Sequence, residues 1–569
     1  MPDSPIGFGG ADWFAFSLTA LLIGTAFIWR APLQHRLERF AGQKLRAMLV
    51  LFALPILLRL LLLSNHPVPT PNIYDEFSHL LGADTLLHLR LANPPHPLHQ
   101  FFETFFVLQQ PSYSSIYPPG QALLLAVGKV VSGYAWTGVL LATGTFCALC
   151  HWMLCPYVGP GWAFLGGLLA VAQFGPLNSW TNSYWGGMLA AVAGCLVFGA
   201  LPRLRERWVK REDAEPRDAM LLGAGLGMHV LTRQFQSVFL LLSIITFLLP
   251  LVRKRALWKS HVRTFGITGV AVLPALILTA VQNRAATKSW SMLPERLSQI
   301  QYGLPTTLTI QPPARPQLPL TREQALAYRA QALMHGPDRD TWARFLDRLQ
   351  YRVRDYRFFF LPPLYLALVA FALAWREWYF GWLLATFAFF ALGTNLFPYL
   401  LVQYLAALTC LFVLVSVEGL RQISRLEIRA IPVGRGIVQL IVVLCFTPAV
   451  LWYGLHLSET WFPPSSLLQF ETWDEINHGN PERRIAVAKQ VAEIPGRLLI
   501  FVHYTPRHIF QDEWVWNAAD IDTSRVVWAR DLGAVENEKL IHYYPNRKVI
   551  LFEPDLATPR LSLYPTQIH

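Results

Sequence analysis

Two adjacent carboxylates, Asp75 and Glu76, stand in the segment NIYDEFSHLL, shortly after a long apolar run ends. His79 follows Asp75 by four residues, so on a helix these two side chains share a face. A carboxylate in such a place can act as the general base that removes a proton from an attacking hydroxyl. Asp75 could instead cap the helix that follows, and the Asp/Glu/His group could hold a divalent metal. The residues alone leave base, cap and metal ligand open.

A second candidate is Arg233, which lies within the apolar stretch 219–251. An ionisable residue inside an apolar stretch is costly and therefore suggests a function. Its guanidinium could bind the phosphate of a lipid through two parallel hydrogen bonds, or it could simply reach the membrane interface. The phosphate interpretation is favoured because two predicted helices, 219–232 and 235–251, meet at Arg233 on the same side as Asp75.

Polar and aromatic residues of two further segments could contact a sugar. The segment NSWTNSYWGG contains Asn182 and Tyr184, and the later turn TNLFPYLLVQY contains Gln403. The alternatives are an aromatic belt at the membrane interface for the first segment and a hydrogen bond between helices for Gln403. The candidate substrate-binding residues are His79, Tyr117, Asn182, Tyr184 and Gln403.

The chain that positions these residues has the composition of a membrane protein. Of its 569 residues, 53% are hydrophobic and 15% are charged, against about 25% charged in an ordinary soluble domain. A span takes about 20 apolar residues, and the sequence predicts a mainly α fold with about twelve spans. The predicted spans are 13–29, 47–63, 136–154, 161–177, 184–201, 219–232, 235–251, 264–282, 358–374, 378–394, 399–417 and 437–455.

The distribution of basic residues orients these spans, because short basic loops belong in the cytoplasm. Most of the short-loop Lys and Arg residues lie in the loops 30–46, 202–218, 252–263 and 418–436. The outer segments are then 64–135, with a juxtamembrane helix at 118–132, and 283–357. Topology thus accounts for the net charge of +12, and nucleic-acid binding has no support.

The segment 456–569 differs in composition and predicts a domain of its own, after a membrane domain at 1–455. Short apolar runs alternate with helical spacing, which is typical of a small α/β unit with a mostly parallel sheet. The predicted elements are a helix at Glu482–Glu493, strands at Arg497–Tyr504 and Val526–Trp528, a helix at Gly533–Tyr544 and a strand at Lys548–Phe552.

The acidic pair Asp75 and Glu76, followed by YPPGQALLLAVG and later by NSYWGG and GALPRL, resembles the bacterial GT-C glycosyltransferases. The family 39 proteins, related to protein O-mannosyltransferases and aminoarabinose transferases, are the most similar, over roughly residues 45–420. The resemblance implies a multi-pass enzyme of the bacterial inner membrane, with its active site and C-terminal domain in the periplasm. It implies a polyprenyl-phosphate sugar donor and a typically inverting reaction. Asp75 is implied to be the base, with Glu76 beside it, and Arg233 to contact the donor phosphate.

Two positions depart from the family pattern. Relatives often have a basic residue just before Tyr-Pro-Pro, where this chain has Ile116. They often have a Glu two residues after an Arg-Pro pair, where this chain has Gln236. Both departures concern the contacts to the donor phosphate, and a changed donor or a loss of activity would account for them.

We therefore expect a membrane glycosyltransferase that moves a sugar from a polyprenyl-phosphate donor to an acceptor hydroxyl, with Asp75 as base. The expected partners are membrane lipid, the polyprenyl-linked donor and a glycan, lipid or protein acceptor. No cofactor is certain, and a divalent metal is an open alternative. The alternative function is a non-enzymatic lipid-glycan transporter or flippase, which should show internal repeats and polar groups at the bilayer midplane. The chain shows no such repeat, and its polar clusters lie at one face.

Overall fold

The long apolar stretches of the sequence are helical. The computed structural model describes residue 17 and residues 38–252, 257–336, 339–429, 431–457 and 481–565. The predicted span 13–29 lies outside the described residues, apart from Ser17. The helices that correspond to the other predicted spans are α3 (Lys44–Leu61), α6 (Trp136–Val158), α7 (Pro160–Phe174), α8 (Met188–Val209), α9 (Pro216–Val230), α10 (Gln234–Val252), α11 (Trp258–Thr287), α16 (Phe380–Thr394), α17 (Thr409–Ser424) and α18 (Val433–Leu457).

By length and composition, six of the described helices could cross a membrane, or seven if one bent pair is a single span. The bent pair joins Trp342–Phe359 to Pro362–Ala374 at an angle of 116°. The predicted span 358–374 is therefore not one straight helix, because two consecutive prolines interrupt the helical hydrogen bonds. It divides into η4 (Val353–Phe359), η5 (Pro362–Leu364), α15 (Tyr365–Ala370) and η6 (Phe371–Ala374). The total of twelve spans stays a prediction.

The structure confirms that the stretch 219–251 forms two helices that meet at Arg233. At the end of α9 the backbone N–H of Leu231 donates to the carbonyl of Gly227 at 3.0 Å, and that of Arg233 donates to the carbonyl of His229 at 2.7 Å. The first helical bond of α10 runs from the Ser237 N–H to the Arg233 carbonyl at 3.0 Å. Arg233 is thus fixed at a short link between two helices.

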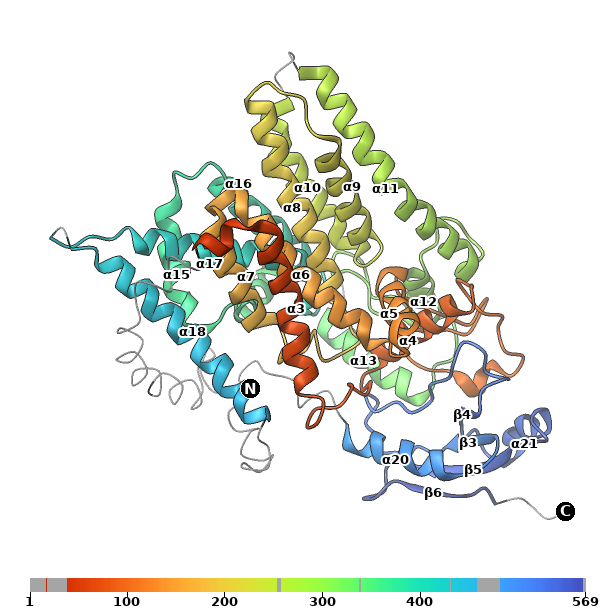
Figure 1. Cartoon of the computed structure of the whole chain (residues 1–569). Helices are drawn as coiled ribbons and strands as arrows, with labels where there is room; N and C mark the ends of the chain where they lie inside the picture. Colours follow the sequence, from red (N-terminus) through yellow and green to blue (C-terminus); the bar gives the residue numbers. More distant parts are fainter. Residues whose placement is uncertain are drawn as a thin grey trace.

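The membrane-type helices differ in how deeply they are buried, and α11 lies at the edge of the helix group (Figure 1). In Val402–Ser424, which comprises η7 (Val402–Leu408) and α17, 94% of the span is buried, whereas in α11 only 11% is buried. The exposed residues of α11 include Val270 and Ile277. An exposed apolar face of this kind suits contact with lipid.

The two predicted outer segments fold into short helices and a small hairpin. Residues 64–135 contain α4 (Tyr74–Leu87), η2 (His99–Phe102), β1 (Val107–Leu108), β2 (Ser114–Ser115) and α5 (Pro119–Ser132). Residues 283–357 contain α12 (Pro294–Tyr302), α13 (Arg322–His335) and α14 (Trp342–Arg352). Helix α5 coincides with the predicted juxtamembrane helix and exposes Val127, Val130 and Val131, as a helix on a membrane surface would.

The C-terminal elements agree with the prediction from sequence. They are α20 (Glu482–Glu493), β3 (Leu498–Val502), β4 (Val526–Arg530), α21 (Ala534–Tyr543), β5 (Lys548–Glu553) and an unpredicted β6 (Arg560–Leu563). The sheet has the order β4-β3-β5-β6, with β3 parallel to both β4 and β5 and only β6 antiparallel. The prediction of a mostly parallel sheet is confirmed.

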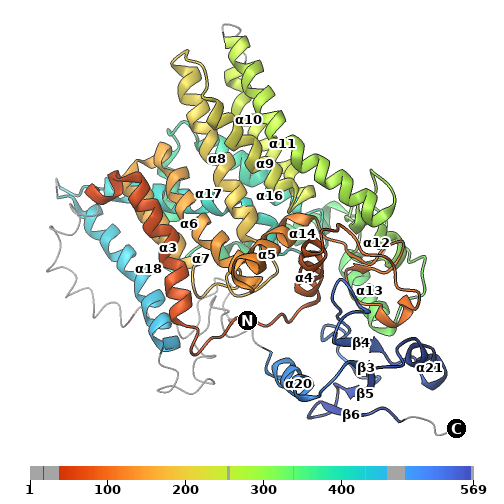
Figure 2. The same ribbon diagram turned by 45° about the vertical axis from the view of Figure 1, so that its right-hand side comes forward.

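One face of this sheet packs against the first outer segment (Figure 2). Leu81 of α4 and Phe101 of η2 share a hydrophobic cluster with Leu499 and Phe501 of β3. Both views place the sheet beside α4 and α13, away from the far tips of α10 and α11. The C-terminal domain and the predicted outer segments therefore form one body at a single end of the helix group.

Candidate active site

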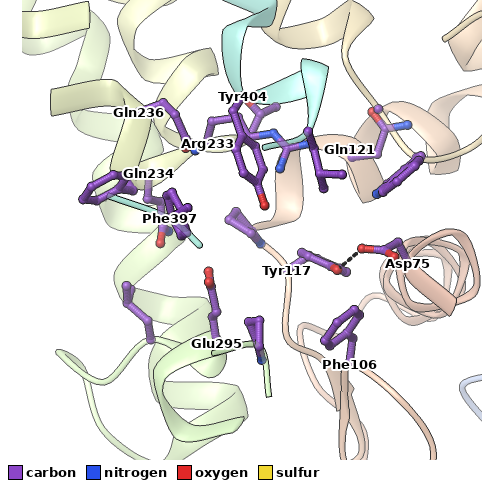
Figure 3. Close-up of a pocket in the computed structure, with 18 of the residues that line it drawn as sticks. Asp75, Phe106, Tyr117, Gln121, Arg233, Gln234, Gln236, Glu295, Phe397 and Tyr404 are labelled. Atoms are coloured by element: carbon purple, nitrogen blue, oxygen red, sulfur yellow. Dashed lines mark hydrogen bonds between the residues drawn. The ribbon is translucent and has the colours of Figure 1, made fainter. Parts of the chain in front are cut away.

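A cavity of about 760 Å³ opens between the helix group and the outer segments (Figure 3). Its walls come from α4, the link between β2 and α5, the start of α8, the α9–α10 link, α12 and the turn 397–404. Four of the residues predicted from sequence line it, namely Asp75, His79, Tyr117 and Arg233. The base and the cation proposed from sequence thus share one cavity.

Asp75 lies in the first turn of α4 and is buried. The hydroxyl of Tyr117 donates a hydrogen bond to its Oδ1, and the side chain of Trp185 also hydrogen-bonds to it. Burial raises the pKa of Asp75 to about 6, while the bonds from Tyr117 and Trp185 and the charge of Arg233 oppose this rise. A carboxyl with such a pKa is ionised at neutral pH and accepts a proton readily, which suits a general base.

Glu76 does not line the cavity, and the structure gives it a capping role instead. Its Oε2 accepts the backbone N–H groups of Asn72 at 2.8 Å and Ile73 at 3.2 Å. Its Oε1 accepts the N–H of Tyr184 at 2.8 Å. The helix cap that the sequence offered for Asp75 is therefore supplied by Glu76. Because its oxygens are used in this way, Glu76 holds α4 against the segment before α8, and Asp75 is the carboxylate of the pair that faces the cavity.

His79 follows Asp75 by one helical turn and stacks on Tyr117, with ring centroids 4.4 Å apart. Burial lowers the pKa of His79 to about 3, so its imidazole is neutral. Its Nδ1 is buried without a hydrogen-bond partner in the described part of the chain. The described residues contain no group of three His, Cys, Asp or Glu side chains that could hold a metal. Among the described residues, Asp75, Glu76 and His79 therefore do not form a metal site made of protein ligands alone.

Arg233 reaches the cavity from the link between α9 and α10. Its guanidinium lies over the ring of Tyr404, with Cζ 5.4 Å from the centroid. Within the described ranges it has no ion-pair partner. Gln234 and Gln236 of the first turn of α10 line the cavity too, and the N–H groups of a first turn have no partner inside the helix. A free guanidinium at a helix N-terminus is suited to bind a phosphate.

Three predicted substrate-binding residues lie outside the cavity lining. Asn182 accepts a hydrogen bond from Arg59 Nε at 2.6 Å and donates to the carbonyls of Pro176 and Asn178, both at 2.8 Å. The hydroxyl of Tyr184 donates to the carbonyl of Pro69 at 2.8 Å. These bonds hold the segment before α8 in place.

The third, Gln403, is buried in η7 and is not part of the lining either. The same two segments instead place Trp185, Tyr399 and Tyr404 in the cavity.

Several lining residues of other segments were not predicted, and two of them are polar residues from distant parts of the chain. Glu295 comes from α12 in the second outer segment, and Gln511 comes from the C-terminal domain. The only local signal for Glu295 is a Pro-Glu pair at a helix start, which is also the ordinary sequence of a helix N-terminus. Nothing in the sequence around Gln511 distinguishes it, because its position depends on the packing of the whole domain.

Comparisons with known proteins agree with this architecture. No family model matches the chain, and no curated protein matches its sequence. The solved structure of ArnT from Cupriavidus metallidurans in the apo state has a TM-score of 0.50 and 13% identity, over 89% of this chain and 92% of its own. ArnT from the same organism bound to undecaprenyl phosphate has a TM-score of 0.49 and 12% identity over the same shares.

The oligosaccharyltransferase of Archaeoglobus fulgidus in the apo form has a TM-score of 0.40 and 10% identity, over 81% of this chain and 62% of its own. Identities of this size can establish only a shared fold. Among these structures, the apo form of ArnT is the one whose TM-score supports a shared fold. The chain therefore has the fold of ArnT, in agreement with the family resemblance of its sequence motifs.

Proposed function

We propose that this protein is a membrane glycosyltransferase that moves a sugar from a polyprenyl-phosphate donor to the hydroxyl of a glycan, lipid or protein acceptor. The observation that carries the proposal is that Asp75 and Arg233 line one cavity although they come from α4 and the α9–α10 link. A base and a phosphate-binding cation that line one cavity are what such a transfer needs.

The reaction follows from these positions. The acceptor oxygen attacks the anomeric carbon of the sugar, and its proton passes to the Asp75 carboxylate. The bond between the anomeric carbon and the phosphate oxygen breaks, and polyprenyl phosphate leaves. Arg233 and the free N–H groups at the start of α10 stabilise the negative charge that builds on the phosphate. Tyr117 holds Asp75 in place through its hydrogen bond.

The surroundings of the cavity support a lipid donor. The walls combine aromatic rings such as Phe106, Phe397 and Tyr404 with amides such as Gln121 and Gln234, and the helices around them expose apolar faces. The fold of ArnT, an aminoarabinose transferase, is consistent with this chemistry. We place the cavity at the periplasmic face of a bacterial inner membrane, with the C-terminal domain on the same side.

The test uses the purified full chain in lipid nanodiscs. Mass spectrometry identifies any polyprenyl-phosphate sugar that co-purifies, and undecaprenyl phosphate is titrated as a probe. The protein should bind undecaprenyl phosphate and, with a total membrane extract as acceptor source, convert the glycosyl lipid to the free polyprenyl phosphate. Asp75→Asn should abolish the conversion but keep the binding and the Tm. Asp347→Asn, on the exposed surface of α14, is the matched control and should leave the conversion intact.

Two results would contradict the proposal. One is an absence of both co-purified glycosyl lipid and undecaprenyl phosphate binding. The other is full turnover by Asp75→Asn. A transporter or flippase would bind the glycosyl lipid without converting it, so an unchanged mass of the lipid after incubation would favour that alternative.

A further inference from the structure

One carboxylate of the cavity, Glu295, has no part in the reaction described above. It lies in the first turn of α12, directly after Pro294. Figure 3 shows its side chain entering the cavity from α12, whereas Asp75 enters from α4. In the part of the chain that the structure describes, its carboxylate has no hydrogen-bond or ion-pair partner. A partly buried carboxylate without a partner loses hydration and gains nothing in return.

The electrostatic surroundings of Glu295 point to Arg233. Burial raises the pKa of Glu295, and the charge of Arg233 is what opposes the rise. The same guanidinium also acts on Asp75. The charge of Arg233 therefore lowers the pKa of both carboxylates, although Asp75 and Glu295 come from different elements. In a glycosyl phosphate the sugar is bonded directly to the phosphate, so a side chain close to a phosphate at Arg233 is within reach of the sugar.

The chemistry of Glu295 is suited to hydroxyl groups. An ionised carboxylate offers only acceptors, and a sugar ring offers several hydroxyl donors. Gln299, one turn later on α12, lines the cavity with Glu295 and shares its face of the helix. Hydrogen bonds from sugar hydroxyls would give the Glu295 carboxylate the partners that it lacks.

We propose that Glu295 is a sugar-binding residue, whose carboxylate accepts hydrogen bonds from ring hydroxyls of the transferred sugar while Arg233 holds the phosphate. This inference rests on the proposed function. No bond is made or broken at Glu295, so its contribution lies in the affinity for the sugar and in the orientation of the anomeric carbon toward the acceptor.

The experiment compares lipids with and without a sugar. Decaprenyl phosphate, and decaprenyl phosphates that carry glucose, mannose or galactose, are titrated into the full chain in nanodiscs. The wild-type protein should bind at least one glycosyl lipid more tightly than decaprenyl phosphate. Glu295→Gln keeps the shape of the side chain and should weaken the binding of that glycosyl lipid by about tenfold or more, the effect of losing a charged acceptor. Its affinity for decaprenyl phosphate should stay that of the wild type.

Two control variants separate the sugar from the phosphate. Arg233→Ala should weaken the binding of all four lipids, because each of them carries the phosphate. Glu212→Gln removes an exposed carboxylate at the far end of α8 and should change none of them.

Three outcomes would overturn the inference: equal weakening of lipids with and without sugar in Glu295→Gln, no weakening at all, or a wild-type protein that binds no glycosyl lipid better than decaprenyl phosphate. Failure of the wild-type protein to bind any of the four lipids would instead overturn the proposed function as well.

Discussion

The backbone N–H of Gly120 donates a hydrogen bond to the carbonyl oxygen of Leu231 at 2.7 Å. This bond joins the Tyr-Pro-Pro-Gly motif at the start of α5 to the link that carries Arg233. Tyr117, three residues before Gly120, donates to Asp75. The motif therefore connects the candidate base to the candidate phosphate-binding residue.

The close approach at Gly120 gives a first prediction. A Cβ at this position would lie 2.6 Å from the Leu231 oxygen and 2.7 Å from Cγ2 of Thr232, both too close for real atoms. Gly120→Ala should push the α9–α10 link away, destabilise the protein by about 1–3 kcal/mol and weaken the binding of undecaprenyl phosphate. Thermal unfolding and lipid titration measure the two effects. Gly266→Ala, where a Cβ meets open space on α11, should lower neither the stability nor the affinity for undecaprenyl phosphate. A Gly120→Ala variant that behaves like Gly266→Ala would argue against a tight contact between α5 and the α9–α10 link.

The pKa of Asp75 sets the pH dependence of turnover. A base must be deprotonated to act, and burial raises the pKa of Asp75 to about 6. The value of kcat/KM should therefore be constant above this pH and fall about tenfold for each pH unit below it. Measurements from pH 5 to 8 with the co-purified glycosyl lipid check the profile. A flat profile across this range would remove Asp75 from the role of base.

Tyr117 tunes that profile through its hydrogen bond to Asp75. The bond favours the ionised carboxylate and so lowers the pKa of Asp75. Tyr117→Phe removes it, and the acid limb of kcat/KM should move to higher pH while turnover on the plateau decreases. The control is Tyr453→Phe, which loses a hydroxyl bonded to the Leu58 carbonyl at 2.8 Å, away from the cavity. If the acid limb of kcat/KM stays at the same pH in Tyr117→Phe, the hydrogen bond from Tyr117 does not act on the group whose protonation limits turnover.

Local signals in the sequence were enough to predict most of the elements but only part of the site. The α20 helix and the parallel strands follow from apolar spacing, and the break at Arg233 follows from a charge inside an apolar stretch. Arg233 and Asp75 could be found because charged residues near apolar runs need a reason to be there. The charge of these residues and their position beside apolar runs can both be seen in the sequence without the tertiary structure.

The remaining site residues depend on tertiary contacts that no local pattern encodes. Asn182 looks suited to a sugar, but its amide is used by Arg59, 123 positions earlier in the chain. Glu76 looks like a partner of Asp75, but its oxygens accept backbone N–H groups, one of them from Tyr184. Glu295 becomes a candidate only when α12 is packed against the helix group. Type and spacing select residues that are capable of chemistry, and only the fold shows which are free to do it.

The capping role of Glu76 gives a prediction that separates it from Asp75. Glu76→Gln keeps one acceptor oxygen but loses the charge, and Glu76→Ala loses all three hydrogen bonds to the backbone. Since buried donors are then left unpaired at a cost of about 1–3 kcal/mol each, the Ala variant should have a lower Tm than the Gln variant. Turnover per folded molecule should fall far less in Glu76→Gln than in Asp75→Asn. Equal loss of turnover at unchanged Tm would instead make Glu76 a second catalytic carboxylate.

Arg530 of β4 fastens the C-terminal domain to both outer segments. Its Nη1 lies 2.5 Å from Oε2 of Glu323 on α13, its Nη2 pairs with Glu513, and its Nε donates to the Glu103 carbonyl at 2.6 Å. The Arg530, Glu323 and Glu513 side chains are all nearly inaccessible to solvent. Arg530→Ala removes a counter-charge from two buried carboxylates and leaves Glu323 only its longer pair with Arg322 at 3.9 Å. Breaking a buried pair in this way costs about 3–5 kcal/mol.

We therefore expect Arg530→Ala to loosen the C-terminal domain before the helix group unfolds. Limited proteolysis of the variant should cleave off the C-terminal domain at protease concentrations that leave the wild-type chain intact. The cavity should also lose the wall that Gln511 contributes, so turnover should decrease while undecaprenyl phosphate still binds at Arg233. Arg560→Ala removes an exposed arginine paired with Glu553 in the same domain, a pair worth about 1 kcal/mol or less. If both variants resist protease equally, the domain is held by its apolar contacts with α4 and η2, because the charge network is then dispensable.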